Sequence, residues 1–204
     1  MVHDADNHGA RQKKQGLAPT FSWGVGTRDE FSVGLYYLNV EGRPLYNHPW
    51  VLGQDGQILP TLPAKNYYGL ASDYLNTTTQ YLTLGHTHRF DDGGELQTRL
   101  RTGRYERDLL ASTIGFMQPR PTSLDQITDS TVLTRGSKGR VARSDITQIQ
   151  SDYSNAFTLG GQQHKVIAGI DYTDEDADRN NSYANTTPRP NTTVGTPDDG
   201  AWVA

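Results

Sequence analysis

Glu-Phe-Ser-Val-Gly-Leu-Tyr-Tyr-Leu-Asn-Val, residues 30–40, alternates large apolar side chains with small or polar ones over most of its length. Side chains of a β-strand point alternately to its two faces, so Phe31, Val33 and Leu35 would share one face and Gly34 would lie on the other. Such alternation is typical of a strand whose two faces meet different surroundings. This stretch therefore predicts a two-faced sheet.

The rest of the chain repeats this strand pattern. Further strands are predicted at residues 17–25, 77–90, 95–105, 145–159 and 164–173. Very short turns, at residues 26–29, 91–94 and 160–163, alternate with long polar connections, at residues 41–76 and 106–144. Because the two kinds of connection alternate, every short turn lies at one end of the sheet and every long loop at the other. Transmembrane β-barrels have this asymmetry, with strands of about ten alternating residues.

The segment 95–105 indicates what each face of the sheet meets. Leu96 and Leu100 fall on one face, and Arg99 and Arg101 fall on the other. Arginine is costly in a dry core and is tolerated where a face meets water. We therefore expect an all-β fold, an antiparallel transmembrane β-barrel segment of about six strands in hairpins with long extracellular loops.

The alternative is a soluble β-sandwich or small barrel that binds a ligand such as a carbohydrate. A sandwich would have to bury Arg99 and Arg101 or leave one face of a sheet open to solvent. The strand 95–105 therefore discriminates between the two folds.

Composition favours a barrel wall over a compact domain. Of 204 residues 34% are hydrophobic, and the 21 glycines bring the apolar share only to the lower edge of the range of about 45–50%, glycine included, that is usual for soluble domains. The net charge of −4 creates no basic field, so we expect no nucleic-acid partner. The absence of cysteine excludes disulfides and thiolate metal sites.

The expected domain organisation has three parts. Residues 1–15 are polar and lack periodicity, and they are expected to form a loop or a disordered lead-in. Residues 16–184 are expected to form the partial barrel. Residues 185–204, which are rich in Asn, Thr and Pro, are expected to form a loop or a disordered tail.

Three stretches carry a resemblance to a known family: Leu-Ala-Pro-Thr-Phe-Ser-Trp-Gly-Val-Gly (17–26), Tyr-Gly-Leu-Ala-Ser-Asp-Tyr (68–74) and Gly-Gln-Gln-His-Lys-Val-Ile-Ala-Gly-Ile-Asp-Tyr (161–172). In this order and spacing they resemble TonB-dependent outer-membrane receptors, particularly those for ferric catecholate siderophores. The resemblance implies a protein of the Gram-negative outer membrane with a ferric siderophore as ligand. It also implies contact with outer-membrane lipid and, through a plug domain, with the TonB complex, and it implies no catalytic cofactor.

Members of this family have an amino-terminal plug, a TonB-contacting box and a barrel of about 22 strands. The present chain has room for about six strands and none for a plug. An open wall would leave unpaired strand edges, which lipid does not tolerate. We therefore expect a fragment of a receptor, or a truncated reading frame, that does not transport alone.

Candidate ligand-binding residues fall into two groups. Arg99 and Arg101 would face the lumen, where the guanidinium group recognises diffuse negative charge well, as on a ferric catecholate. The alternative is that Arg99 and Arg101 contact a plug domain or form salt bridges with carboxylates on neighbouring strands. Trp50, Tyr67 and Tyr68 in the first long loop could stack on aromatic ligand rings; the alternative is that they anchor the loop.

His86 and His88 lie on one face of a predicted strand, about 7 Å apart by strand rise. A metal site would need a third ligand such as Asp, Glu or His. The sequence does not place one, so no metal site is expected, and the two histidines are interpreted as polar residues beside a turn. No Ser, His and Asp set with hydrolase spacing is present either. The chain is not expected to be an enzyme.

Overall fold

The computed structural model describes residues 2–7, 9–180 and 187–203. Within these ranges the regular secondary structure is β-strand, apart from one short 3₁₀ helix. The elements are β1 (Val2–Asn7), β2 (Ala10–Leu17), β3 (Thr20–Trp23), β4 (Asp29–Arg43), β5 (Trp50–Leu52), β6 (Ile58–Pro60), β7 (Tyr74–Arg89), β8 (Glu95–Phe116), β9 (Val132–Leu159), β10 (Gln162–Asn180), β11 (Thr192–Thr193) and a short 3₁₀ helix (Leu124–Gln126). None of the described helices is long and apolar enough to cross a membrane.

The long strands form one antiparallel sheet in the order β1-β2-β4-β7-β8-β9-β10, and β3 pairs with β4. Each long strand lies beside the next one in the chain, so the topology is an up-and-down meander. β2 and β3 pair with β4 in one register, Leu17 opposite Tyr37 and Thr20 opposite Gly34. They therefore act as a single strand that is interrupted near Pro19, which has no N–H to donate.

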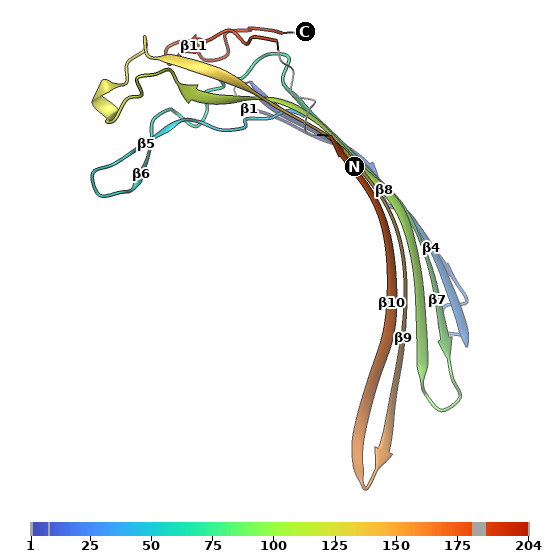
Figure 1. Ribbon diagram of the computed structural model, residues 1–204. Helices are drawn as coiled ribbons and strands as arrows, with labels where there is room; N and C mark the ends of the chain where they lie inside the picture. Colours follow the sequence, from blue (N-terminus) through green and yellow to red (C-terminus); the bar gives the residue numbers. More distant parts are fainter. Residues whose placement is uncertain (1, 8, 181–186, 204) are drawn as a thin grey trace.

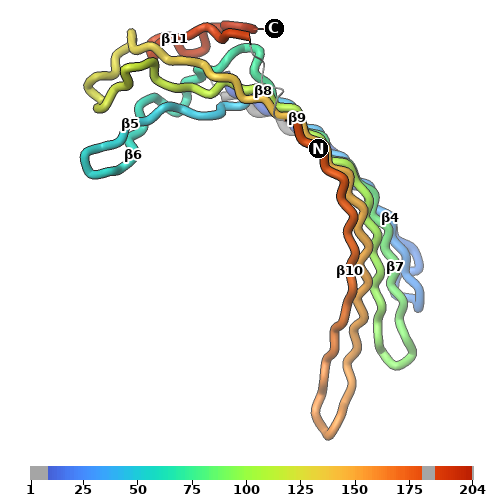
Figure 2. Tube along the Cα trace, in the orientation of Figure 1, coloured from blue at the N-terminus to red at the C-terminus, as the bar shows by residue number. Residues whose placement is uncertain are grey.

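The three predicted short turns and the long connections lie at opposite ends of the sheet (Figure 1), whereas the β1–β2 turn, which joins Asn7 to Ala10, lies at the long-loop end. The β3–β4, β7–β8 and β9–β10 turns all lie at one end. Gly26 and Gly93 have φ angles of 75° and 84° in the first two turns. A left-handed backbone of this kind favours glycine, which explains the glycine in each short turn. The long connections and the tail gather at the other end (Figure 2).

The register separates an apolar row of side chains from a polar row. Residues directly opposite one another across β4, β7, β8, β9 and β10 are Val33, Leu84, Leu100, Ile149 and Tyr172. The next row, on the opposite face, is Gly34, Thr83, Arg101, Gln148 and Thr173. Leu84 is 41% exposed and Ile149 is 45% exposed, so the apolar face has no cover within the described chain. A bare apolar face opposite a polar one is the pattern of a membrane barrel wall.

Aromatic rings form a row near the short-turn end of the apolar face. The row runs partly along and partly across the strands, each ring next to the following one, through Phe21, Trp23, Phe31, His86, His88, Phe90 and Tyr153. Successive ring centroids lie 4.6 to 6.3 Å apart. Barrels of the outer membrane carry such a girdle where the wall meets the lipid headgroups. The row therefore marks the level of one membrane interface.

The structure corrects the predicted secondary structure in two regions. β8 continues to Phe116 and β9 begins at Val132, so most of the predicted connection 106–144 is strand and only residues 117–131 form the loop. Residues 1–15 were predicted as loop or disorder, yet β1 and β2 lie there and pair with each other and with β4. Beyond the bilayer both faces of a strand are wet, so backbone pairing continues without hydrophobic alternation and the sequence signal is lost.

The soluble sandwich alternative is wrong for this chain. The described strands form one nine-stranded sheet and a two-stranded hairpin, β5–β6, of three residues per strand. So small a hairpin cannot cover a face of the long sheet. Arg99 and Arg101 are exposed, as a wet face requires.

The buried side chains gather at the long-loop end and not in the wall. The cluster joins the first long loop to the upper parts of β8 and β9, and its members are Val51, Leu62, Tyr68, Ile114, Phe116 and Leu133. Leu59, Ile127 and Val194 pack around it. The loops therefore form a packed structure of their own at one end of the wall.

The two faces of the wall predict different responses to substitution by arginine. Leu84→Arg places a charge on the apolar face and should lower the free energy of unfolding in lipid vesicles by about 2–4 kcal/mol. Thr83→Arg is the matched control on the polar face and should change it by less than about 0.5 kcal/mol. Urea titrations of the two variants in vesicles measure the difference. Equal effects would contradict the assignment of the faces.

Candidate functional site

Arg99 and Arg101 lie on the polar face of β8, as the sequence predicted, and both are exposed. The guanidinium carbon of Arg101 lies 4.7 Å from the ring centroid of Tyr81 on β7. Arg104 falls on the other face, where its Nε donates to Asp145 Oδ1 at 2.8 Å. The β8–β9 register runs without a bulge, so strand alternation alone separates Arg104 from the other two arginines.

Two stacked tyrosines support Arg101. The rings of Tyr36 and Tyr81 lie 4.6 Å apart with an interplanar angle of 5°. Gly103 lies opposite Tyr81, and a Cβ there would approach the Tyr81 Cβ to 2.6 Å. The glycine therefore leaves room for the tyrosine on this face. A cation over stacked aromatic rings forms a surface that suits a ligand with both negative charge and aromatic rings.

The aromatic residues predicted to stack on a ligand behave differently from one another. Trp50 is 54% exposed on β5, so its ring stays accessible. Tyr67 and Tyr68 are 1% and 0% exposed, and neither ring offers a face to a ligand in this structure. Tyr68 Oη donates to the carbonyl of Val194, and Tyr67 Oη donates to the carbonyl of Leu70. In this structure both tyrosines anchor the loop, which is the alternative that the sequence left open for them.

A buried ion pair ties the tail to the first long loop. The side chains of Asp73 and Arg189 are 1% and 3% exposed, and Arg189 Nη1 lies 3.0 Å from Asp73 Oδ1. The second Asp73 oxygen accepts from the backbone N–H groups of Leu70, at 3.1 Å, and Ser112, at 2.8 Å. These contacts satisfy the buried carboxylate, as burial of a charge requires. Asp73 thus joins the loop, β8 and the tail.

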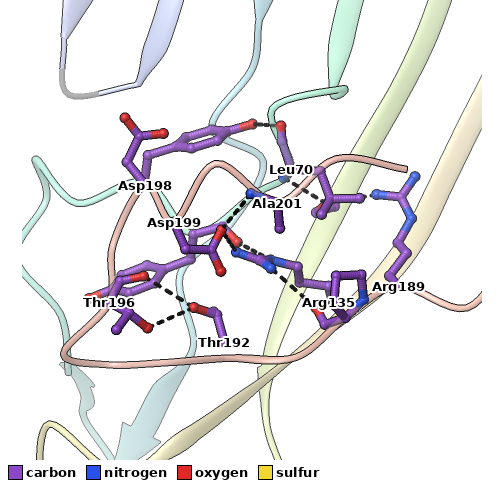
Figure 3. Close-up of polar contacts among 12 residues, drawn as sticks. Leu70, Arg135, Arg189, Thr192, Thr196, Asp198, Asp199 and Ala201 are labelled. Carbon is purple, nitrogen blue, oxygen red and sulfur yellow. Dashed lines mark hydrogen bonds and ion pairs between the residues drawn. The ribbon is translucent and has the colours of Figure 1, made fainter. Parts of the chain in front are cut away.

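A second ion pair holds the end of the tail (Figure 3). The Arg135 side chain on β9 is 0% exposed, and its Nη2 donates to Asp199 Oδ1 at 2.8 Å. Its Nε donates to the carbonyl of Tyr68. Burial raises the pKa of Asp199, but hydrogen bonds from Arg135 and from the N–H of Ala201 more than offset this, and the net pKa is lowered. The described tail, predicted as loop or disorder, is irregular but firmly held.

The structure supplies a third group to the two predicted histidines. His86 Nε2 lies 3.0 Å from Asp29 Oδ1, and His88 Nδ1 lies 2.7 Å from the same oxygen. Asp29 is the first residue of β4 and lies directly opposite His88 in the β4–β7 register. The sequence missed it because the partner comes from another strand, 57 residues before His86. Strand register, once known, identifies it at once.

Other functional residues were missed for the same reason. Tyr36 and Tyr81 become neighbours only when β4 pairs with β7, and Asp73 and Arg189 lie 116 residues apart in sequence. A single sequence shows which residues of one strand share a face. It does not show which residues lie opposite one another on neighbouring strands. A hairpin-by-hairpin estimate of register would have found the tyrosine pair.

The architecture is that of part of a TonB-dependent receptor β-barrel of the outer membrane. Crystal structures with the same fold include the ferric-catecholate import receptor Fiu of Escherichia coli K12 in its open form, with TM-score 0.79 and 20% identity over 99% of this chain and 32% of that one. The siderophore receptor PiuA of Acinetobacter baumannii matches with TM-score 0.69 and 17% identity over 87% of this chain and 26% of its own. The ferripyoverdine receptor of Pseudomonas aeruginosa matches with TM-score 0.72 and 13% identity over 97% of this chain and 25% of that one.

The sequence itself is homologous to the catecholate siderophore receptor Fiu of Escherichia coli K12. The two are 23% identical over 185 residues, which is 85% of this chain and 24% of that receptor. The Fiu sequence of Escherichia coli O157:H7 is 22% identical over the same shares of the two chains. The chain therefore spans about a quarter of the length of the curated relatives it matches. No protein-family profile matches it.

Because the Asp73–Arg189 ion pair is buried, removal of the Asp73 charge should have a large effect on stability. Asp73→Asn leaves the Arg189 guanidinium buried without a counter-charge and should destabilise the loop cluster by about 3–5 kcal/mol. Asp91→Asn is the control, because it breaks an ion pair whose side chains are 57% and 91% exposed, and it should change stability by about 1 kcal/mol or less. Protection of the tail from proteolysis at increasing urea measures both. Similar curves for the two variants would refute a structural role for Asp73.

The buried phenol of Tyr67 should make the folded chain less stable at alkaline pH. Burial, and then the nearby Asp73 carboxylate, raise the pKa of the Tyr67 phenol above its ordinary value. The unfolded chain ionises this phenol near pH 10 and the folded chain does not, so its contribution is full below about pH 10 and declines above it. Tyr67→Phe should flatten this decline in urea unfolding curves between neutral and alkaline pH. Tyr46→Phe, at an exposed tyrosine, should leave the decline unchanged.

Proposed function

We propose that this chain is part of the barrel wall of a TonB-dependent outer-membrane receptor that takes up ferric catecholate siderophores. The observation that carries the proposal is the homology to the catecholate receptor Fiu, together with the cationic and aromatic surface on the polar face. In this proposal the polar face lines the lumen, the apolar face meets lipid, and the long-loop end lies outside the cell.

The surface around Arg101 supports a catecholate ligand by its chemistry. Ferric catecholates are anionic and rich in aromatic rings. Arg101 over the stacked pair of Tyr81 and Tyr36 supplies a delocalised cation beside ring faces, and Arg99 lies on the same face two residues along β8. Guanidinium groups hold diffuse negative charge well and stack on rings. Trp50 adds an exposed indole at the long-loop end.

The remaining parts of the proposal concern the protein that contains this wall. The relatives are transport receptors and not enzymes. We propose an outer-membrane location in a Gram-negative cell, a barrel completed by further strands, and energy coupling through a plug domain to the TonB complex. The two edges of the described sheet, formed by β1 and β3 on one side and by β10 on the other, support completion by further strands, since lipid does not tolerate unpaired backbone groups.

Uptake measurements test the proposal in the organism that makes this chain. Disruption of its coding sequence should lower uptake of radiolabelled iron presented as a catecholate chelate under iron limitation. Uptake of iron presented as a hydroxamate chelate is the control and should be unchanged. Unaltered catecholate uptake, in a strain without another catecholate receptor, would overturn the proposal.

A pair of arginine variants tests the role of the polar face. Arg101→Ala removes the cation over Tyr81 and should reduce uptake of the ferric catecholate several-fold, with a loss of about 1–2 kcal/mol of binding free energy. Arg104→Ala is the matched control, three residues along the same strand on the opposite face. It should leave uptake within error of the unaltered protein at equal amounts of receptor in the membrane. Equal effects would exclude a special role for Arg101.

A further inference from the structure

We propose that Asp29, His86 and His88 form a binding site for a divalent transition-metal ion of the zinc class. The site lies beside the short turns, at the opposite end of the wall from the loop cluster. It does not depend on the proposed transport function, and its failure would leave that proposal intact. Two imidazoles and one carboxylate are a frequent protein ligand set for zinc, with a fourth position left for water.

The three ligand atoms are already close to a metal-binding arrangement. Asp29 Oδ1 lies 3.0 Å from His86 Nε2 and 2.7 Å from His88 Nδ1, and all three groups offer ligand atoms within 4.8 Å of one another. In a tetrahedral site with bonds near 2.1 Å, ligand atoms lie about 3.4 Å apart. Side-chain rotations that move these atoms by less than about one ångström would admit the ion.

Neighbouring aromatic rings hold both imidazoles in place. Phe31 stacks on His86, with ring centroids 4.6 Å apart and an interplanar angle of 13°. Phe90 meets His88 edge-on at 4.7 Å. The backbone is equally fixed, because Asp29 pairs with His88 and Phe31 pairs with His86 in the same ladder. Little side-chain freedom remains to be lost when a metal binds, which favours affinity.

The position gives the site access to water. Asp29 lies four residues from Val33, the β4 member of the apolar row, which is about 13 Å along the strand towards the turn. The side chains of Asp29 and His86 are 43% and 39% exposed, and that of His88 is 28% exposed. His86 and His88 are themselves members of the aromatic row, so the site lies at the level of this row and the ion would enter past Asp29, from the short-turn side.

The ligand chemistry selects the metal. Imidazole nitrogen suits zinc, copper, nickel and cobalt, whereas magnesium and calcium take oxygen ligands. Each histidine would present the lone pair of the nitrogen that now faces Asp29 and carry its proton on the other ring nitrogen. A divalent ion would leave this group of three ligands with a net charge of +1, because the carboxylate is its only anion.

Metal binding to the full chain in detergent micelles tests the site, with Co²⁺ as a spectroscopic probe and Zn²⁺ as its competitor. We expect one Co²⁺ per chain with the strong visible absorption of tetrahedral coordination, displaced by Zn²⁺ and not by Mg²⁺. Loss of an outer-shell partner alone weakens metal binding by about 10–100-fold, so His88→Gln, His86→Gln and Asp29→Asn should each weaken it at least tenfold.

His164→Gln is the matched control, because this histidine lies on β10, away from the proposed site, and should leave affinity unchanged. Circular dichroism of every variant identifies any loss of strand content, and a measurement in concentrated urea identifies binding by the unfolded chain. Weak octahedral absorption alone, equal binding in urea, or full affinity in folded Asp29→Asn and His88→Gln would each overturn the proposal.

Discussion

The constraint on which the structure depends is the unbroken register of the backbone ladder from β4 to β10. The β4–β7, β7–β8, β8–β9 and β9–β10 pairs run without a bulge through 14, 16, 22 and 19 residue pairs. Because side chains alternate with period two, a slip of one residue on one strand would exchange its apolar and polar faces. The register therefore keeps the apolar row that contains Leu84 on one face of the sheet and the polar row that contains Arg101 on the other face.

The same ladder also sets each local site. It brings Tyr36 to Tyr81, Arg101 to the same tyrosine, and Asp29 to His88. The backbone hydrogen bonds of the ladder already hold these residues side by side. The side-chain contacts therefore do not have to supply the free energy that brings the residues together. A barrel wall can thus carry different chemistry at different heights while its fold stays constant.

The loop end is organised by a different principle. Here burial is local, and the buried charges Asp73, Arg135 and Arg189 link segments that are far apart in the sequence. A buried ion pair adds little net stability compared with an apolar core, but losing one partner is expensive. Such pairs therefore specify one loop arrangement more than they strengthen it. The burial of Tyr67 and Tyr68 follows from this arrangement, and it favours the loop-anchoring alternative over ligand stacking.

The sequence by itself determined the wall: about six strands, their two faces, the end that carries the short turns, and the placement of Arg99 and Arg101 on the wet face. Those features depend on alternation and turn chemistry, which are local and visible in one chain. The tertiary structure alone decided the strand extensions above the bilayer, the pairing of β1 and β2, the Asp29 partner of the histidines and the ion pairs of the tail. Each of these depends on backbone pairing where both faces are wet, or on contacts between distant segments, and neither leaves a periodic signal in the sequence.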